Sequence, residues 1–238
     1  MITRITALVT GHWQLIALTA LVFALWPYDI MAPVRILVVF FHEAAHAGMT
    51  LLTGGSVVEF TVAADESGRV VSRGGSRFWT LTAGYLGSLL IGVVLLLTAI
   101  RSTLDRWTLG ALATLILLIT TLYSRDPYPL IFGLATGAAF LATAVFLRAE
   151  FSDLILRIIG LASMIYVPFD IFSDTIKRAH LRSDAFMLAE EFGGTTTLWG
   201  GLWLALSILT IGLTLRFGLG DHSNISFRPT NTDTNHTT

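Results

Sequence analysis

Three side chains suited to metal chemistry lie within little more than one helical turn, in the sequence His-Glu-Ala-Ala-His at residues 42–46. Positions four apart lie on one face of an α-helix, so the imidazoles of His42 and His46 could bind a single metal ion. Glu43 lies about 100° further round the helix, where it could act on a water molecule without binding the ion. This pattern predicts Zn2+ as cofactor, two histidine ligands and Glu43 as the catalytic general base of a hydrolase.

The surroundings of this pattern strengthen the interpretation. For a chain of this length and composition, chance produces about 0.004 copies of the pattern. Residues 36–52 are otherwise apolar, and an ionisable group inside a membrane span costs roughly 2.5–3.5 kcal/mol and usually marks function. The alternative is that the three side chains only form hydrogen bonds between helices.

A catalytic zinc ion usually has three protein ligands and one open position, so another side chain must reach the histidines. The chain has no cysteine, and its other histidines fall in polar segments or near the ends of apolar ones. A carboxylate inside an apolar segment is the better candidate. We expect Asp170, which follows Pro168 by two residues, to be the third ligand, because a proline can locally open a helix. Asp174, one turn further on, is the alternative ligand or a partner of a ligating histidine.

Membrane helices are the elements that must position these residues. The chain has 238 residues, of which 54% are hydrophobic and 13% are charged, whereas soluble domains contain about 25% charged residues. A helix that crosses a bilayer needs roughly 20 apolar residues. We identify seven candidate spans, near residues 12–27, 33–53, 78–100, 107–123, 128–148, 154–176 and 196–217. The first could instead be a signal peptide, so we predict an all-α polytopic membrane protein with six to seven transmembrane helices.

Two segments depart from this helical pattern. Residues 56–73 are predicted to form a small β-hairpin after the second span, with its turn at Asp65-Glu66-Ser67-Gly68. Residues 221–238 are rich in Asn, Thr, Ser and His and are predicted to form a disordered polar tail. Residues 1–220 are then a single transmembrane domain with its core at 33–205. The net charge of −1, without a basic face, indicates no nucleic-acid partner.

The sequence resembles the site-2 protease class of intramembrane zinc metallopeptidases, and more closely its small bacterial-type branch without accessory domains. The resemblance covers most of residues 33–205. It is carried by His42-Glu-Ala-Ala-His46 with Ala47-Gly48, by Leu52-Thr53-Gly54-Gly55 and the hairpin, by Ala83-Gly84-Tyr85-Leu86-Gly87-Ser88, and by the late Pro168-Phe169-Asp170 and Ser183-Asp184-Ala185.

This resemblance implies a zinc ion held by two histidines and a later aspartate, with a glutamate as base. Carried over to this chain, His42 and His46 are ligands, Glu43 is the base and Asp170 is the third ligand. The late motif of the family has Asp followed by Gly after an Asn-Pro context, whereas Asp170 is followed by Ile171. This departure leaves the choice between Asp170 and Asp174 open.

The expected activity is hydrolysis of peptide bonds in or near transmembrane segments of membrane-protein substrates. A helical substrate hides its carbonyls in its own hydrogen bonds and must unwind, and an exposed edge of the 56–73 hairpin could hold the unwound strand by β-addition. The hairpin could instead be a structural flap. We expect a multi-pass protein of the cell membrane, in contact with the lipid bilayer.

Two other functions remain open from the sequence. One is a catalytically inactive metal-binding membrane protein that binds or shields a membrane client. The other is a transporter that uses the intramembrane carboxylates as an ion path, although we find no internal repeat of the kind many transporters show.

Overall fold

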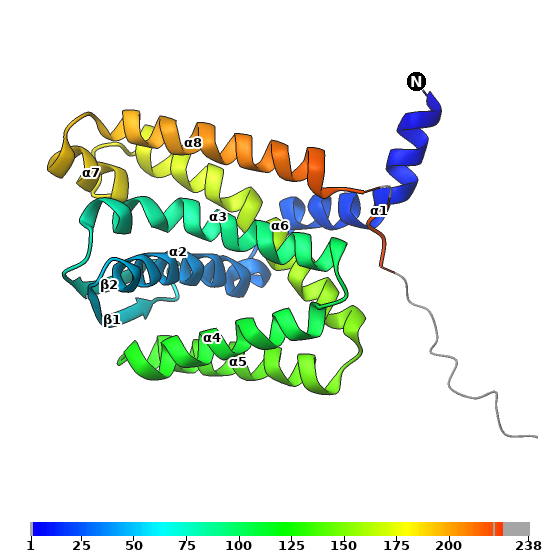
Figure 1. Cartoon of the computed structure of the whole chain (residues 1–238), viewed down its shortest axis with the longest axis horizontal. Helices are drawn as coiled ribbons and strands as arrows, with labels where there is room; N and C mark the ends of the chain where they lie inside the picture. Colours follow the sequence, from blue (N-terminus) through cyan, green and yellow to red (C-terminus); the bar gives the residue numbers. More distant parts are fainter. Residues whose placement is uncertain (1, 221, 226–238) are drawn as a thin grey trace, which may run out of the picture.

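The computed structural model describes residues 2–220 and 222–225. Its helices form a bundle with a short hairpin at one end (Figure 1). The elements are α1 (Ile2–Leu25), η1 (Asp29–Met31), α2 (Ala32–Leu52), β1 (Ser56–Val62), β2 (Gly68–Arg73), α3 (Arg77–Arg101), α4 (Asp105–Tyr123), α5 (Pro127–Phe146), α6 (Ala149–Phe172), η2 (Ser173–Lys177), α7 (Asp184–Phe192), α8 (Thr196–Leu213) and η3 (Thr214–Gly218).

Seven helical segments among the described residues are long and apolar enough to cross a membrane. They are Thr6–Leu25, Asp29–Leu52, Arg77–Arg101, Asp105–Tyr123, Pro127–Phe146, Ala149–Lys177 and Thr196–Gly218. This confirms the predicted all-α polytopic fold, with the upper of the two expected numbers of spans. Helix α7 is a short helix between two of these spans, and the apolar pattern of the sequence does not predict it.

Helix α3 lies in the middle of the bundle and packs against α2 and α6, while α4 and α5 pair with each other at one edge (Figure 1). Glycines allow the closest approach. A Cβ atom added at Gly160 of α6 would lie 2.9 Å from the carbonyl oxygen of Gly92 on α3. Small residues at such crossings let the backbones of membrane helices pack tightly, which brings α3 close to α6.

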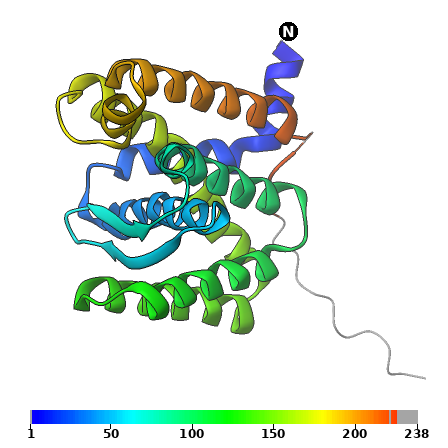
Figure 2. The ribbon, with the colours of Figure 1, turned by 60° about the vertical axis from the view of Figure 1, so that its left-hand side comes forward.

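The predicted hairpin is present, as an antiparallel pair with Phe60 of β1 opposite Val70 of β2. It lies along α2 (Figure 2). Phe60 is fully buried, and its ring lies 4.7 Å from the ring of Phe40 on α2, measured between centroids. Alternate side chains of a strand point to opposite faces, so the buried face of β1 attaches the hairpin to the helix that carries the metal-binding pattern.

Within the predicted polar tail the structure describes residues 222–225, and Ser223 contacts α1. The N–H of Ser223 donates to the carbonyl of Gly11 at 2.8 Å, and the Ser223 hydroxyl lies 2.8 Å from Nδ1 of His12. His12 has non-helical backbone angles within α1. Backbone groups of its neighbours can therefore form hydrogen bonds with residues outside this helix. The rest of the predicted tail, apart from residues 222–225, lies outside the described residues.

Candidate metal centre and catalytic site

The two histidines of α2 direct their Nε2 atoms to one point. These atoms lie 2.9 Å apart, and the two rings meet nearly at right angles. Nδ1 of His46 donates a hydrogen bond to the carbonyl of Thr80 on α3 at 2.6 Å. Such a bond fixes the tautomer and the orientation of the ring, and it leaves Nε2 free to bind a metal. The predicted pairing of His42 and His46 on one helix face is present.

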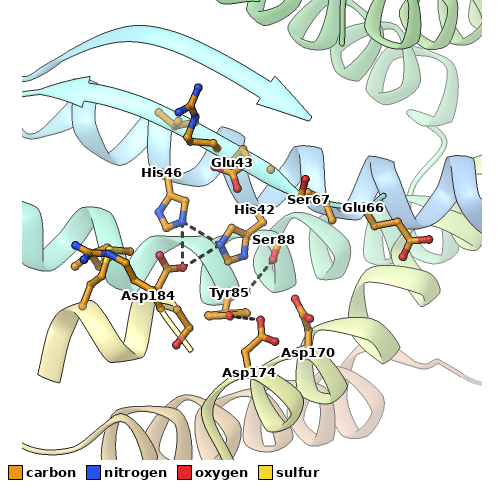
Figure 3. A pocket seen from close by; sticks show the side chains of 18 of the residues that line it. His42, Glu43, His46, Glu66, Ser67, Tyr85, Ser88, Asp170, Asp174 and Asp184 are labelled. Carbon is orange, nitrogen blue, oxygen red and sulfur yellow. Dashed lines mark hydrogen bonds and ion pairs between the residues drawn. The ribbon is translucent and has the colours of Figure 1, made fainter. Parts of the chain in front are cut away.

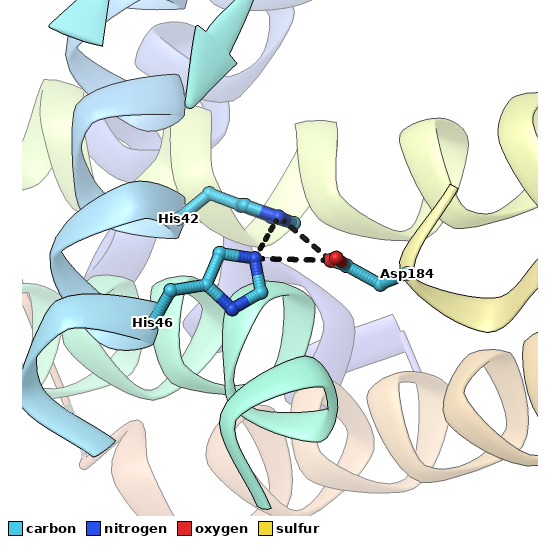
Figure 4. Close-up of side chains that lie close together, drawn as sticks. All are labelled: His42, His46 and Asp184. Atoms are coloured by element: carbon cyan, nitrogen blue, oxygen red, sulfur yellow. Dashed lines mark hydrogen bonds and ion pairs between the residues drawn. The ribbon is translucent and has the colours of Figure 1, made fainter. Parts of the chain in front are cut away.

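Asp184 brings a carboxylate to the same point (Figure 4). Its Oδ2 lies 3.0 Å from Nε2 of His42 and 3.1 Å from Nε2 of His46. Asp184 is the first residue of α7, and the hydroxyl of Ser183 caps this helix by accepting the N–H of Phe186 at 3.2 Å. Burial alone would raise the pKa of Asp184, but the adjacent imidazoles outweigh burial and hold that pKa below its usual range.

The three side chains fit a zinc ion. Their ligand atoms form one group of potential metal ligands and are separated by 2.9–3.1 Å. Zinc bonds of about 2.0–2.2 Å in tetrahedral geometry place ligand atoms about 3.3 Å apart, so the observed atoms need to move outward by only a few tenths of an ångström, on the same principle. Two nitrogens and one oxygen are a donor set that zinc accepts at catalytic centres.

Asp170 and Asp174 lie elsewhere in the same pocket (Figure 3). The hydroxyl of Tyr85 donates to Oδ2 of Asp174 at 2.9 Å, and Arg178 forms an ion pair with the other oxygen. Asp170 is hydrogen-bonded to Tyr166. Neither carboxylate belongs to the group of potential ligand atoms.

The structure thus brings Asp184 to the two histidines, and not Asp170 or its alternative Asp174, the carboxylates expected as the third ligand. The physical reason is that the chain turns back after η2, and α7 then packs against α3 and α8. This packing carries Asp184 to the histidines. The cost of placing an ionisable group in a membrane favours a carboxylate inside an apolar segment as the functional one, whereas Asp184 lies just outside such a segment. The signal that could have found it was Ser183-Asp184-Ala185, a helix N-cap sequence that also carried part of the family resemblance.

Glu43 lies beside the histidines on the side of α2 that faces the hairpin (Figure 3). It is 7% exposed. Its carboxylate accepts a hydrogen bond from the backbone N–H of Val70 on β2. Gly68 also lies against this carboxylate, since a Cβ added there would come within 2.6 Å of Oε1 of Glu43. Strand β2 therefore forms one wall directly against the predicted base.

A cavity of about 630 Å³ connects these groups. Residues of α2, the hairpin, α3, α6 and α7 line it, and many of them are polar. On one side the ring of Tyr85 meets His42 edge-on, with 4.6 Å between the ring centroids. Hydrolysis within a membrane needs water at the reacting bond, and a polar cavity of this size provides space for water and for a segment of peptide.

One comparison with known proteins gives a match. A family model described as Peptidase M50B-like matches residues 15–214. The chain belongs to the Peptidase M50B-like family. This membership confirms the predicted relationship to the site-2 protease class. Together with the seven apolar helices, it identifies this M50B-like chain as an integral membrane protein. No curated protein and no solved structure gives a significant match.

The region matched by the M50B-like model contains the hairpin and every residue of the candidate centre. His42, Glu43 and His46 lie near its beginning, and Asp184 lies near its end. The match to a peptidase family therefore covers the residues that form the candidate site.

Proposed function

We propose that this protein is a zinc-dependent metalloendopeptidase of the cell membrane that hydrolyses peptide bonds in or near transmembrane segments of membrane-protein substrates. The observation that carries the proposal is the convergence of His42, His46 and Asp184 beside the buried carboxylate of Glu43. Three ligands leave one coordination position of a zinc ion open, as catalytic zinc sites do.

Each residue of the centre has a distinct role in this proposal. His42 and His46 would hold the ion through Nε2 and Asp184 would hold it through Oδ2. A bound zinc ion supplies Lewis-acid activation of water and of the peptide carbonyl. The Glu43 carboxylate takes the proton from the attacking water and passes it to the leaving nitrogen. Thr80 keeps His46 in the ligating orientation through its carbonyl.

The hairpin is the proposed docking element for the substrate. Strand β2 pairs with β1 in a two-stranded sheet, and Gly68, Val70 and Ser72 of β2 line the cavity on the other side. An unwound segment of a membrane-protein substrate could add to this edge as a third strand, which would hold its backbone extended beside Glu43. Extension exposes the carbonyls that a substrate helix hides in its own hydrogen bonds.

The decisive experiment compares wild type with Glu43→Gln for zinc content and for cleavage of a purified transmembrane substrate. We expect both proteins to bind about one zinc per chain. Loss of the general base should lower kcat by roughly 10²–10⁴-fold. Zinc-loaded wild type that leaves membrane-protein substrates intact would refute the proposal and favour a non-catalytic protein that binds or shields a client. The placement of Glu43 beside the ligands opposes that alternative, because a site that only binds metal needs no base.

A further inference from the structure

One guanidinium joins three segments, which are α2, the tip of the hairpin and the connection between α1 and α2. Nε of Arg35, on α2, donates to Oε1 of Glu66 at the tip of the hairpin, at 2.6 Å. Nη1 of the same side chain donates to the carbonyls of Trp26 and Tyr28, in the connection between α1 and α2, at 2.5 Å and 3.0 Å. The Arg35 side chain is 12% exposed and that of Glu66 27%, so water screens this ion pair less than it would screen a surface pair.

The hairpin tip is rigid enough to transmit this restraint. Glu66 has a positive φ of 66°, which a residue with a side chain rarely adopts. Oδ1 of Asp65 accepts both the N–H of Ser67 at 3.1 Å and its hydroxyl at 2.6 Å, and the N–H of Ala63 donates to the carbonyl of Ser67 at 2.9 Å. A turn held by several local hydrogen bonds moves as a unit, so fixing Glu66 fixes the start of β2.

The start of β2 rests on the predicted base. Gly68 follows Glu66 by two residues, and an added Cβ there would lie 2.7 Å from Cγ of Glu43 and 2.8 Å from Cγ1 of Val39. Val70 follows by four residues, and its N–H donates to the Glu43 carboxylate. Arg35 and Glu43 are both on α2, so this helix holds the hairpin at its tip and along its edge.

We propose that Arg35 is a positioning residue for the base: by holding Glu66, it keeps β2 in the place where Gly68 and the Val70 N–H orient the Glu43 carboxylate. This inference rests on the proposed function, in which Glu43 is the base. It assigns a role to Arg35 and Glu66, which contribute no ligand to the candidate metal centre. The ion pair also joins the hairpin to the connection between α1 and α2.

The test compares Glu66→Ala and Glu66→Gln with a matched control, Glu59→Ala. Glu59 also belongs to the hairpin and also pairs with an arginine, Arg69, at 3.1 Å, but it does not line the cavity. Steady-state kinetics on one transmembrane substrate would separate kcat from KM, and metal analysis would give zinc content. A misplacement of about 1 Å can cost roughly 10²-fold in rate, so we expect Glu66→Ala to lower kcat by about that factor while zinc is retained. The kcat of Glu66→Gln should lie between those of Glu66→Ala and wild type, because the amide oxygen of glutamine can still accept a hydrogen bond from Arg35.

A second readout follows the position of the hairpin without relying on catalysis. The chain has no cysteine, so Val62→Cys introduces a single thiol at a site that is 1% exposed in β1. In detergent-solubilised protein, a water-soluble maleimide should label this thiol slowly when Glu66 is present. We expect labelling at least tenfold faster when Glu66→Ala is added, and unchanged labelling when Glu59→Ala is added.

Three outcomes would overturn the inference. They are unchanged kcat with only a higher KM in Glu66→Ala, loss of zinc together with activity, or equal labelling in the Glu66→Ala and Glu59→Ala backgrounds. Failure of the proposed function is distinguishable, because it would appear as a wild type that binds zinc and cuts no substrate. Fast labelling specific to Glu66→Ala would then still show that the ion pair holds the hairpin.

Discussion

Oδ2 of Asp184 lies 3.0 Å from Nε2 of His42, although 142 positions separate the two residues in the chain. The helix α2 sets the spacing of the two histidines by itself. The carboxylate arrives only because α7 begins at Asp184 and packs on α3, the helix whose Thr80 carbonyl also orients His46. The candidate metal centre thus combines residues of α2 and α7, and α3 contacts both of these helices.

Asp184 is predicted to be required for zinc binding, and the two aspartates of the α6 region are not. Asp184→Ala removes one of the three proposed ligands. Loss of a residue that only orients a ligand lowers metal affinity by up to about 100-fold, so we expect loss of this ligand to lower zinc affinity by at least about 100-fold. Asp170→Ala and Asp174→Ala should keep wild-type affinity. Competition with a fluorescent zinc chelator would measure all three variants. Normal zinc affinity in Asp184→Ala, with loss in Asp170→Ala, would restore the ligand set first expected from the sequence.

Gly84 of α3 is predicted to be needed for the geometry of the histidine pair. A Cβ added there would lie 2.5 Å from Nε2 of His42 and 2.6 Å from Cε1 of His46. Gly84→Ala should force the rings apart and weaken zinc binding by at least about tenfold, comparable to loss of a partner that orients a ligand. Gly48→Ala is the control, since a Cβ at Gly48 on α2 would meet no atom within 4 Å. Equal zinc affinity in the two variants would contradict this account of Gly84.

The buried Arg157 is predicted to stabilise the bundle far from the metal centre. Its Nε lies 2.5 Å from Oδ1 of Asp153, and the guanidinium also donates to the carbonyls of Ala99 and Ser223. Arg157→Ala would leave Asp153 buried without this partner, which costs about 3–5 kcal/mol of unfolding free energy.

Denaturant unfolding of detergent-solubilised protein would measure this loss. The control is Arg148→Ala, which removes an ion pair to Glu150 from a side chain that is 56% exposed. An exposed pair contributes little to stability, because water and salt screen it. A similar loss in both variants would argue against a special contribution from the buried pair.

Ser72→Pro is predicted to weaken substrate docking without affecting the metal. The backbone N–H groups of alternate strand residues point to the same side, so the N–H of Ser72 points to the same side as that of Val70, which meets Glu43. Proline removes this donor from the proposed docking edge. Loss of one hydrogen bond costs about 0.5–1.5 kcal/mol, so we expect KM to rise by roughly 2–10-fold.

Ser72→Ala is the matched control, because it removes the hydroxyl and keeps the N–H. Zinc content should equal that of wild type in both variants. If Ser72→Pro cleaves with the KM of Ser72→Ala, the substrate does not bind by adding to β2.

Local patterns in the sequence determined most of the elements. The four-residue spacing of His42 and His46 is a property of the α-helix, and continuous apolar segments of about 20 residues specify membrane spans whatever their neighbours are. The hairpin at residues 56–73 was predictable for the same reason, because its strands alternate and its turn residues are local signals. These features depend on residues close together in the chain.

Tertiary packing alone decided which carboxylate lies beside the two histidines and what surrounds Glu43. Asp170, Asp174 and Asp184 all line the cavity, and apolar periodicity alone does not distinguish which carboxylate reaches the histidines. The contact of β2 with Glu43, and the ion pair between Arg35 and Glu66, likewise depend on where the hairpin lies against α2. Contacts between distant segments are set by the packing of whole helices, because a shift of a few ångströms in one helix exchanges one side chain for another at the site.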